Sequence, residues 1–99
     1  MAEKLTYSYE TIFIVDAGLE EDAVKALVEK FTGLIAKNGT VESVDEWGKR
    51  RLAYEINDKT EGYYVLVDFT ADGDFPKELD RQYRITEGIL RTIIIRKDN

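Results

Sequence analysis

The stretch Trp47-Gly48-Lys49-Arg50-Arg51-Leu52-Ala53-Tyr54-Glu55-Ile56 decides the fold, because its apolar side chains recur with a period of two. Such alternation is typical of a β-strand with one buried face. A polar turn over residues 57–60 and a second strand-like run over residues 61–67 follow it. The centre of the chain therefore predicts a β-hairpin that carries three consecutive cations beside a tryptophan.

Outward from the hairpin, the hydrophobic pattern predicts four strands and two helices. Residues 7–15 alternate as a strand, and residues 20–38 carry an apolar stripe at helical spacing. The second strand falls within residues 40–56, with a bulge or bend between 43 and 48 where the alternation breaks. The third strand covers residues 62–70, a second helix begins at Pro76 and runs to about residue 85, and residues 89–97 form the fourth strand.

The element order β-α-β-β-α-β predicts an α+β protein with the ferredoxin-like fold, a four-stranded antiparallel sheet with both helices on one face. Residues 5–97 are expected to form a single domain, as is usual for a chain of 99 residues.

Two helices can cover only one face of this sheet, yet both faces are rich in apolar residues. We assign to the covered face the residues Thr11, Phe13, Val15, Leu52, Tyr54, Val65, Val67, Phe69, Leu90, Thr92 and Ile94. The opposite face then carries Ile12, Ile14, Leu66, Ile93 and Ile95, with Tyr64, Trp47 and Ala53 nearby, and with Lys49, Arg51 and Arg91 projecting from it. A large exposed apolar patch indicates a contact surface. The alternative is that these residues reflect strand propensity alone.

Composition narrows the possible chemistry. The chain has no cysteine and no histidine, which removes disulfides, thiolate ligands and the commonest general base. The net charge is −6, and residues 1–46 account for it with four lysines against ten acids, whereas all six arginines lie in residues 47–99. With no apolar signal or membrane-spanning run, we expect a cytosolic protein. From the uneven charge we expect one acidic side and one side able to bind phosphate.

Catalysis is not expected. The acids at residues 20–22 and 72–74 are typical of a helix start and a loop rather than of a metal site, and the glycines are isolated rather than grouped into a phosphate loop. Binding is better supported: Lys49, Arg50 and Arg51 can meet phosphates, and Trp47 with several tyrosines can stack on unpaired bases. The alternatives are a solvated strand edge for the cations and core packing for the aromatic rings.

Four segments carry a family resemblance: residues 9–11 (Tyr-Glu-Thr), residues 47–56, residues 61–64 (Glu-Gly-Tyr-Tyr) and residues 91–96 (Arg-Thr-Ile-Ile-Ile-Arg). With them the chain resembles the bacterial small-subunit ribosomal protein six family over nearly its whole length. The resemblance implies the ferredoxin-like fold and a structural role in the cytoplasmic ribosome. It also implies binding to 16S rRNA in the platform, cooperatively with small-subunit protein eighteen, with no enzymatic activity, cofactor or metal.

The resemblance assigns roles by position. It implies RNA-binding roles for Lys49, Arg50, Arg51, Arg91, Arg96, Lys97, Tyr9 and Trp47. The uncovered sheet face implies partner-binding roles for Ile12, Ile14, Tyr64, Leu66, Ile93 and Ile95. The chain departs from many relatives at residues 5–8, which are neutral here and basic there.

Two other functions fit the same fold. One is a regulatory domain that self-associates through the open sheet face and binds a small metabolite. The other is an acyl-phosphate hydrolase, which needs an arginine in a phosphate-binding loop after the first strand. Residues 16–19 (Asp-Ala-Gly-Leu) offer no such arginine.

Overall fold

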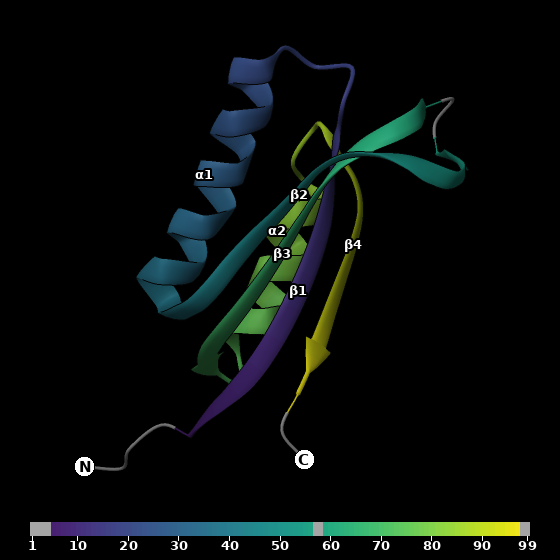
Figure 1. Ribbon diagram of the computed structural model, residues 1–99. Coiled ribbons are helices and arrows are strands. Elements are labelled where there is room, and N and C mark those ends of the chain that lie inside the picture. Colours follow the sequence, from purple (N-terminus) through teal and green to yellow (C-terminus); the bar gives the residue numbers. More distant parts are fainter. Residues whose placement is uncertain (1–4, 57–58, 98–99) are drawn as a thin grey trace.

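The computed structural model describes residues 5–56 and 59–97. Its elements are β1 (Thr6–Asp16), α1 (Glu21–Asn38), β2 (Gly39–Ile56), β3 (Lys59–Asp72), α2 (Phe75–Arg84) and β4 (Ile89–Arg96). Both helices lie on one side of the sheet, and the β2–β3 hairpin projects beyond it (Figure 1). The predicted α+β class and ferredoxin-like order are confirmed. Of the predicted turn, residues 57 and 58 lie outside the described residues, while Lys59 and Thr60 begin β3.

The sheet has the strand order β2-β3-β1-β4, and every neighbouring pair is antiparallel. The register places Ile12 between Leu66 of β3 and Ile93 of β4, so these three residues share one face. Thr11 lies between Val67 and Ile94 on the other face. The central strands β1 and β3 thus carry apolar residues on both faces, and β2 and β4 form the edges.

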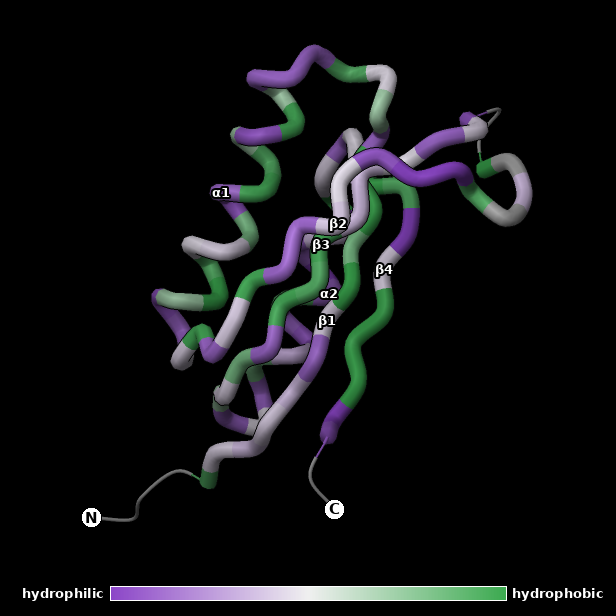
Figure 2. The backbone as a smooth tube through the Cα atoms, in the orientation of Figure 1, coloured by the Kyte–Doolittle hydropathy of each residue, from purple (hydrophilic) through white to green (hydrophobic). Residues whose placement is uncertain are grey.

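The core lies between the sheet and the two helices. Helix α1 contributes Val24, Val28, Phe31 and Ile35, and α2 contributes Phe75, Leu79 and Tyr83. Figure 2 shows the hydrophobic residues of α1 on the side that faces the sheet. Aromatic rings join the layers, since the ring centroids of Phe31 and Tyr83 lie 4.6 Å apart and those of Phe13 and Tyr83 lie 5.5 Å apart.

The predicted division of the faces is right for β1 and β3, and among the residues assigned to the covered face it is wrong at Leu52, Tyr54 and Leu90. Leu52 and Tyr54 lie on the open face, where both line a hollow, and not under the helices. On β4, a register shift next to Ile14 and Val15 pairs Val15 with Ile89, so Ile89 joins the core in place of Leu90. Each error comes from an irregularity in strand pairing, which moves side chains to the other face.

A buried hydrogen bond ties the sheet to α2. The Thr11 hydroxyl lies 2.9 Å from the Ile93 carbonyl oxygen and 3.0 Å from the Tyr83 hydroxyl. Because a hydroxyl carries one hydrogen, Thr11 donates to the carbonyl and accepts from Tyr83. Burial raises the pKa of Tyr83 well above its ordinary value, and the hydrogen bond with Thr11 opposes that rise. The tyrosine therefore stays a neutral donor in the core.

This geometry predicts unequal costs for removing the two hydroxyls. Tyr83→Phe removes one hydrogen bond and leaves Thr11 satisfied, so we expect a loss of about 0.5–1.5 kcal/mol. Thr11→Val leaves the Tyr83 hydroxyl buried without its acceptor, so we expect a loss of about 1–3 kcal/mol. Urea unfolding of both variants measures the order, and equal stabilities would contradict it.

Candidate functional site

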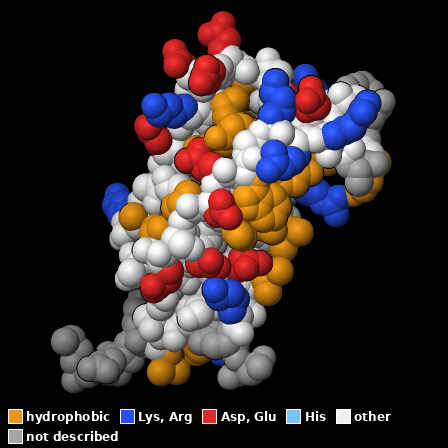
Figure 3. Space-filling model, viewed as in Figure 1, with side chains coloured by type: hydrophobic (Ala, Val, Ile, Leu, Met, Phe, Trp, Pro, Cys, Tyr) orange, Lys and Arg blue, Asp and Glu red, His pale blue; other side chains and the backbone are white. Residues whose placement is uncertain are grey.

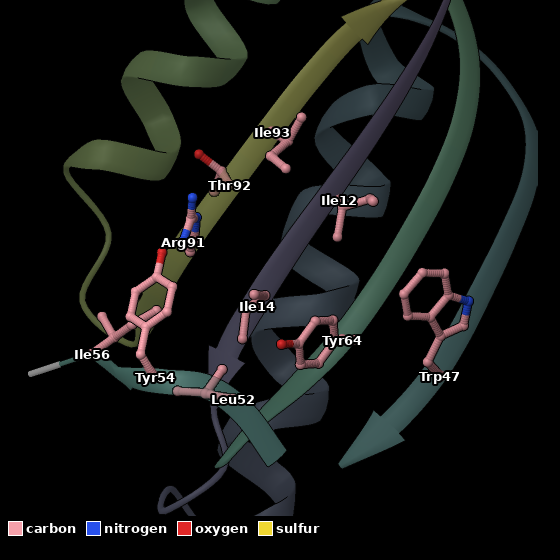
Figure 4. A pocket seen from close by; sticks show the side chains of 10 residues that line it. All are labelled: Ile12, Ile14, Trp47, Leu52, Tyr54, Ile56, Tyr64, Arg91, Thr92 and Ile93. Carbon is pink, nitrogen blue, oxygen red and sulfur yellow. The ribbon is translucent and has the colours of Figure 1, made fainter. Parts of the chain in front are cut away.

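The face of the sheet opposite the helices contains an apolar hollow of about 220 Å³. Four elements line it, and Figure 4 shows the side chains converging from all four strands. The lining residues are Ile12, Ile14, Trp47, Leu52, Tyr54, Ile56, Tyr64, Arg91, Thr92 and Ile93. Arg91 is the one charged residue among them. An antiparallel sheet with a solvated face is normally polar there, so this lining indicates a contact surface.

The floor of the hollow is built on the two central strands. Ile14 of β1 is buried although no helix covers it, because neighbouring side chains close around it. Gly62 of β3 supplies the room: a Cβ at this position would collide with Cγ2 of Ile14 and lie 3.3 Å from Cδ2 of Leu52. The absence of a side chain at residue 62 therefore shapes the floor.

Trp47 forms one wall, and a bulge in β2 places it there. The pairing moves from Glu46 opposite Val65 to Gly48 opposite Tyr64, so Trp47 is an extra residue on the bulged strand. Gly48 has a φ of +82°, a conformation that favours glycine. The Trp47 ring stacks on that of Tyr64 with centroids 6.0 Å apart, and its Nε1 donates to Oδ2 of Asp45.

The end of the hairpin closes the hollow. Between the pairs Arg51–Glu61 and Ile56–Lys59, β2 advances five residues while β3 advances two. The extra residues arch over the open face and bring Leu52, Tyr54 and Ile56 to the hollow (Figure 4). These three residues are absent from the predicted site. The bulge at Trp47 and Gly48 sets the face of these three residues. It lies where the sequence predicts a bulge or bend, but the alternation alone does not show which face the following residues take.

Arg91 of β4, the opposite edge strand of the sheet, contacts the end of the hairpin. Its guanidinium carbon lies 5.5 Å from the centroid of the Tyr54 ring, within the range of a cation–π contact. Tyr54 is 59% exposed, so its ring stands at the rim of the hollow rather than in its floor. Arg91 therefore projects from the open face, as the sequence predicts.

The three consecutive cations do not share one face. After the bulge, Lys49 pairs with Tyr63 and lines a groove with Val24 of α1, so it lies on the helix side. Arg51 has the same parity, whereas Arg50 lies opposite Gly62 on the open side. The prediction that Lys49 and Arg51 project from the open face is wrong, because the extra residue inverts the alternation. All three side chains are exposed, and Figure 3 shows cations gathered toward the hairpin.

Acidic residues occupy the other end of the open face. We call this group the acidic row. Its members are placed on the open face by register or by contacts with open-face residues, and they are Glu10, Glu42, Asp45 and Asp68. The Lys97 ammonium lies 2.9 Å from Oδ1 of Asp68. This hydrogen bond lowers the pKa of Asp68, to which Ser43 also donates, and it raises the pKa of Lys97. Lys97 is therefore placed on the open face but engaged with a carboxylate.

Two predicted RNA-binding residues lie on the helix-covered side. Tyr9 is only 6% exposed and stacks on Phe69 with ring centroids 5.4 Å apart. Its burial leaves no ring face for an RNA base, so we remove Tyr9 from the candidate set. Arg96 lies opposite Tyr9 in the register, and its guanidinium carbon lies 3.8 Å from the centroid of the Tyr7 ring.

The predicted partner-binding residues are all on the open face. Ile12, Ile14, Tyr64 and Ile93 line the hollow, while Leu66 and Ile95 continue the apolar surface toward the acidic row. Ile93 and Ile95 are 43% and 46% exposed. Within residues 5–56 and 59–97, no group of acids is arranged to hold a metal, and no helix is long and apolar enough to cross a membrane.

The fold and this face define a ferredoxin-like α+β protein with an uncovered apolar sheet face. The pattern of the family described as Ribosomal protein S6 matches residues 8–96. A small ribosomal subunit protein bS6 of Clostridium perfringens is 58% identical over 91 residues, covering 91% of this chain and 96% of its own length. That of Clostridium beijerinckii is 57% identical over 88 residues, with coverages of 88% and 93%. The crystal structure of 30S ribosomal protein S6 from Thermotoga maritima superposes with a TM-score of 0.88 at 33% identity, over 94% of this chain and 89% of that one.

The chain belongs to the ribosomal protein S6 family. It is a structural component of the small ribosomal subunit in the bacterial cytoplasm, and not an enzyme. The family identified by resemblance from the sequence is confirmed. Membership of this family is preferred to the two other functions that fit the fold, the metabolite-binding regulatory domain and the acyl-phosphate hydrolase.

The hollow predicts an effect of adding one methyl group to its floor. We expect Gly62→Ala to lower the free energy of unfolding by about 1–3 kcal/mol, because Ile14 and Leu52 must move to admit the Cβ. Gly33→Ala is the matched control, since Gly33 lies on the exposed side of α1 and a Cβ there would have no atom within 4 Å. That change should stabilise the protein by roughly 0.5–1 kcal/mol. Denaturant unfolding compares the two, and a neutral Gly62→Ala would contradict the close packing.

Proposed function

We propose that this chain binds 16S rRNA in the platform of the small subunit, cooperatively with small-subunit protein eighteen. In this proposal the protein partner covers the open sheet face and the RNA meets the hairpin. The apolar hollow on a face without helices is the observation that carries it. Membership of a ribosomal family supplies the class of partners, RNA and protein.

The open face supports a protein rather than a nucleic acid as its main occupant. Trp47, Ile93 and Ile95 are each more than a third exposed and lie on one continuous surface with the hollow. Protein interfaces have an apolar centre and a polar rim, as this face has. Phosphates next to the acidic row would be repelled, which favours the hairpin for RNA.

The hairpin supports contact with phosphate. Lys49, Arg50 and Arg51 are exposed, and within the described residues none of the three forms an ion pair. Arg50 donates to the carbonyl of Lys49, which leaves most of its donors available. Since the side chains alternate between the two sides of β2, cations face outward on both sides of the hairpin. Trp47 remains a candidate contact for either partner.

The net charge explains why binding should be cooperative. A chain of charge −6 is repelled by RNA over most of its surface, so a few cations give weak binding alone. A partner that covers the acidic row removes that repulsion and adds its own charges. The two proteins together would then bind RNA more tightly than either does separately.

The test measures binding to a platform fragment of 16S RNA, with and without protein eighteen, across a salt series. Replacing both Arg50 and Arg51 by alanine should weaken RNA binding by the joint complex and reduce the slope of log K against log salt, by about 0.7–0.9 for each phosphate that is no longer neutralised. Replacing Arg81 and Arg84 by alanine is the control, because these arginines lie on α2 and pair with Glu78 and Asp80.

The outcomes separate the parts of the proposal. Cooperative binding that only the hairpin variant weakens supports both the function and the RNA surface. Cooperative binding that the hairpin variant leaves intact keeps the function and moves the RNA surface elsewhere. No binding even with protein eighteen present would overturn the proposed function.

A further inference from the structure

We infer that the hollow receives one large apolar side chain of the protein partner, and that basic residues beside this anchor side chain lie over the acidic row. The inference rests on the proposed function, since it describes how a protein would occupy the open face. It adds the chemistry of the docking segment and its direction across the sheet.

The size and lining of the hollow favour a single apolar side chain. A volume of about 220 Å³ is too small for a helix of 10–12 Å diameter, and it is bounded by isoleucine, leucine and aromatic side chains. A lysine or arginine seated there would lose its hydration next to the like charge of Arg91. Apolar anchors in well-packed pockets are the usual source of affinity in protein interfaces.

The acidic row fixes the direction of the docking segment. Glu10 is two residues from Ile12 along β1, and Asp45 is two residues from Trp47 along β2. Because a strand rises about 3.3 Å per residue, each acid lies one same-face step, about 7 Å, from the lining of the hollow. Residues immediately beside the anchor can therefore reach the acids, while the other end of the segment points toward Arg91 and the hairpin.

The ion pair of Lys97 and Asp68 shows that this surface accommodates an ammonium group. Lys97 also experiences the charges of Glu10 and Glu42, which help to raise its pKa. The remaining carboxylates attract further cations from a partner. The row therefore complements a basic segment and repels an acidic one or a nucleic acid.

Filling the hollow tests the anchor. Ile93→Trp places an indole in the hollow, and Ile85→Trp is the matched control, because Ile85 is an exposed isoleucine at the C-terminal end of α2, on the helix side of the sheet. Calorimetric titration with protein eighteen should show at least a tenfold loss of affinity for Ile93→Trp and little change for Ile85→Trp. Tyr54→Ala is a second variant that removes an exposed wall, should not disturb the core, and should also weaken binding severalfold.

Reversing one charge tests the direction. Glu42→Lys should weaken the binding of protein eighteen about tenfold at low salt, and less as salt screens the surface. Glu29→Lys makes the same change of net charge on the exposed side of α1 and should leave binding unchanged. Equal effects of the two reversals would show a response to net charge alone and would overturn the assigned direction.

The results distinguish this inference from the proposed function. If the unaltered chain binds protein eighteen and the Ile93→Trp and Ile85→Trp variants bind it equally well, the anchor is wrong while the proposed function stands. If the unaltered chain does not bind protein eighteen, the proposed function is wrong, and so is the inference that rests on it.

Discussion

The burial of apolar surface on two faces of one sheet is the constraint on which this structure depends. Two helices cover one face, and their side chains enclose Phe13, Val65 and Val67 completely. The other face carries isoleucines and aromatic residues without a helix above them. Apolar area of this kind is stabilising only when it is removed from water. The protein covers part of this face itself, because the hairpin arches over Ile14, and the rest of the apolar face stays exposed.

The irregularities of β2 make this arrangement possible. Without the bulge at Trp47 and Gly48, the alternation that places Trp47 on the open face would put Leu52 and Tyr54 on the covered face. The bulge at Trp47 and Gly48 adds one residue, and the arch after Arg51 adds more. One strand thus supplies a wall of the hollow, a set of exposed cations and the cover over its end. Bulges on an edge strand also discourage pairing with a further strand, which suits a protein that presents a face rather than an edge.

Much of this could be predicted from the sequence, because the signals are periodic. The apolar stripe of α1 and the alternation of β1 and β3 fix the elements, their order and the existence of an uncovered apolar face. The positions of Ile12, Tyr64 and Ile93 on that face follow from the same parity.

What the sequence could not predict depends on pairing between strands. The sequence alone does not show that Lys49 and Arg51 turn to the helix side, since one extra residue in β2 inverts the alternation. Nor does it show that Ile89 rather than Leu90 meets the core. The aromatic ring of Tyr9 could stack on an RNA base, but its register opposite Phe69 places it in the core. The hollow itself exists only once four strands are aligned.

The most direct test of the central claim, that the open face is the protein-docking surface, is an NMR titration of the isotope-labelled chain with unlabelled protein eighteen in the absence of RNA. The account predicts that the amide signals of Ile12, Tyr64 and Ile93 shift or broaden while those of exposed positions on α1 do not. Changes confined to the helices, with the open face unaffected, would contradict it.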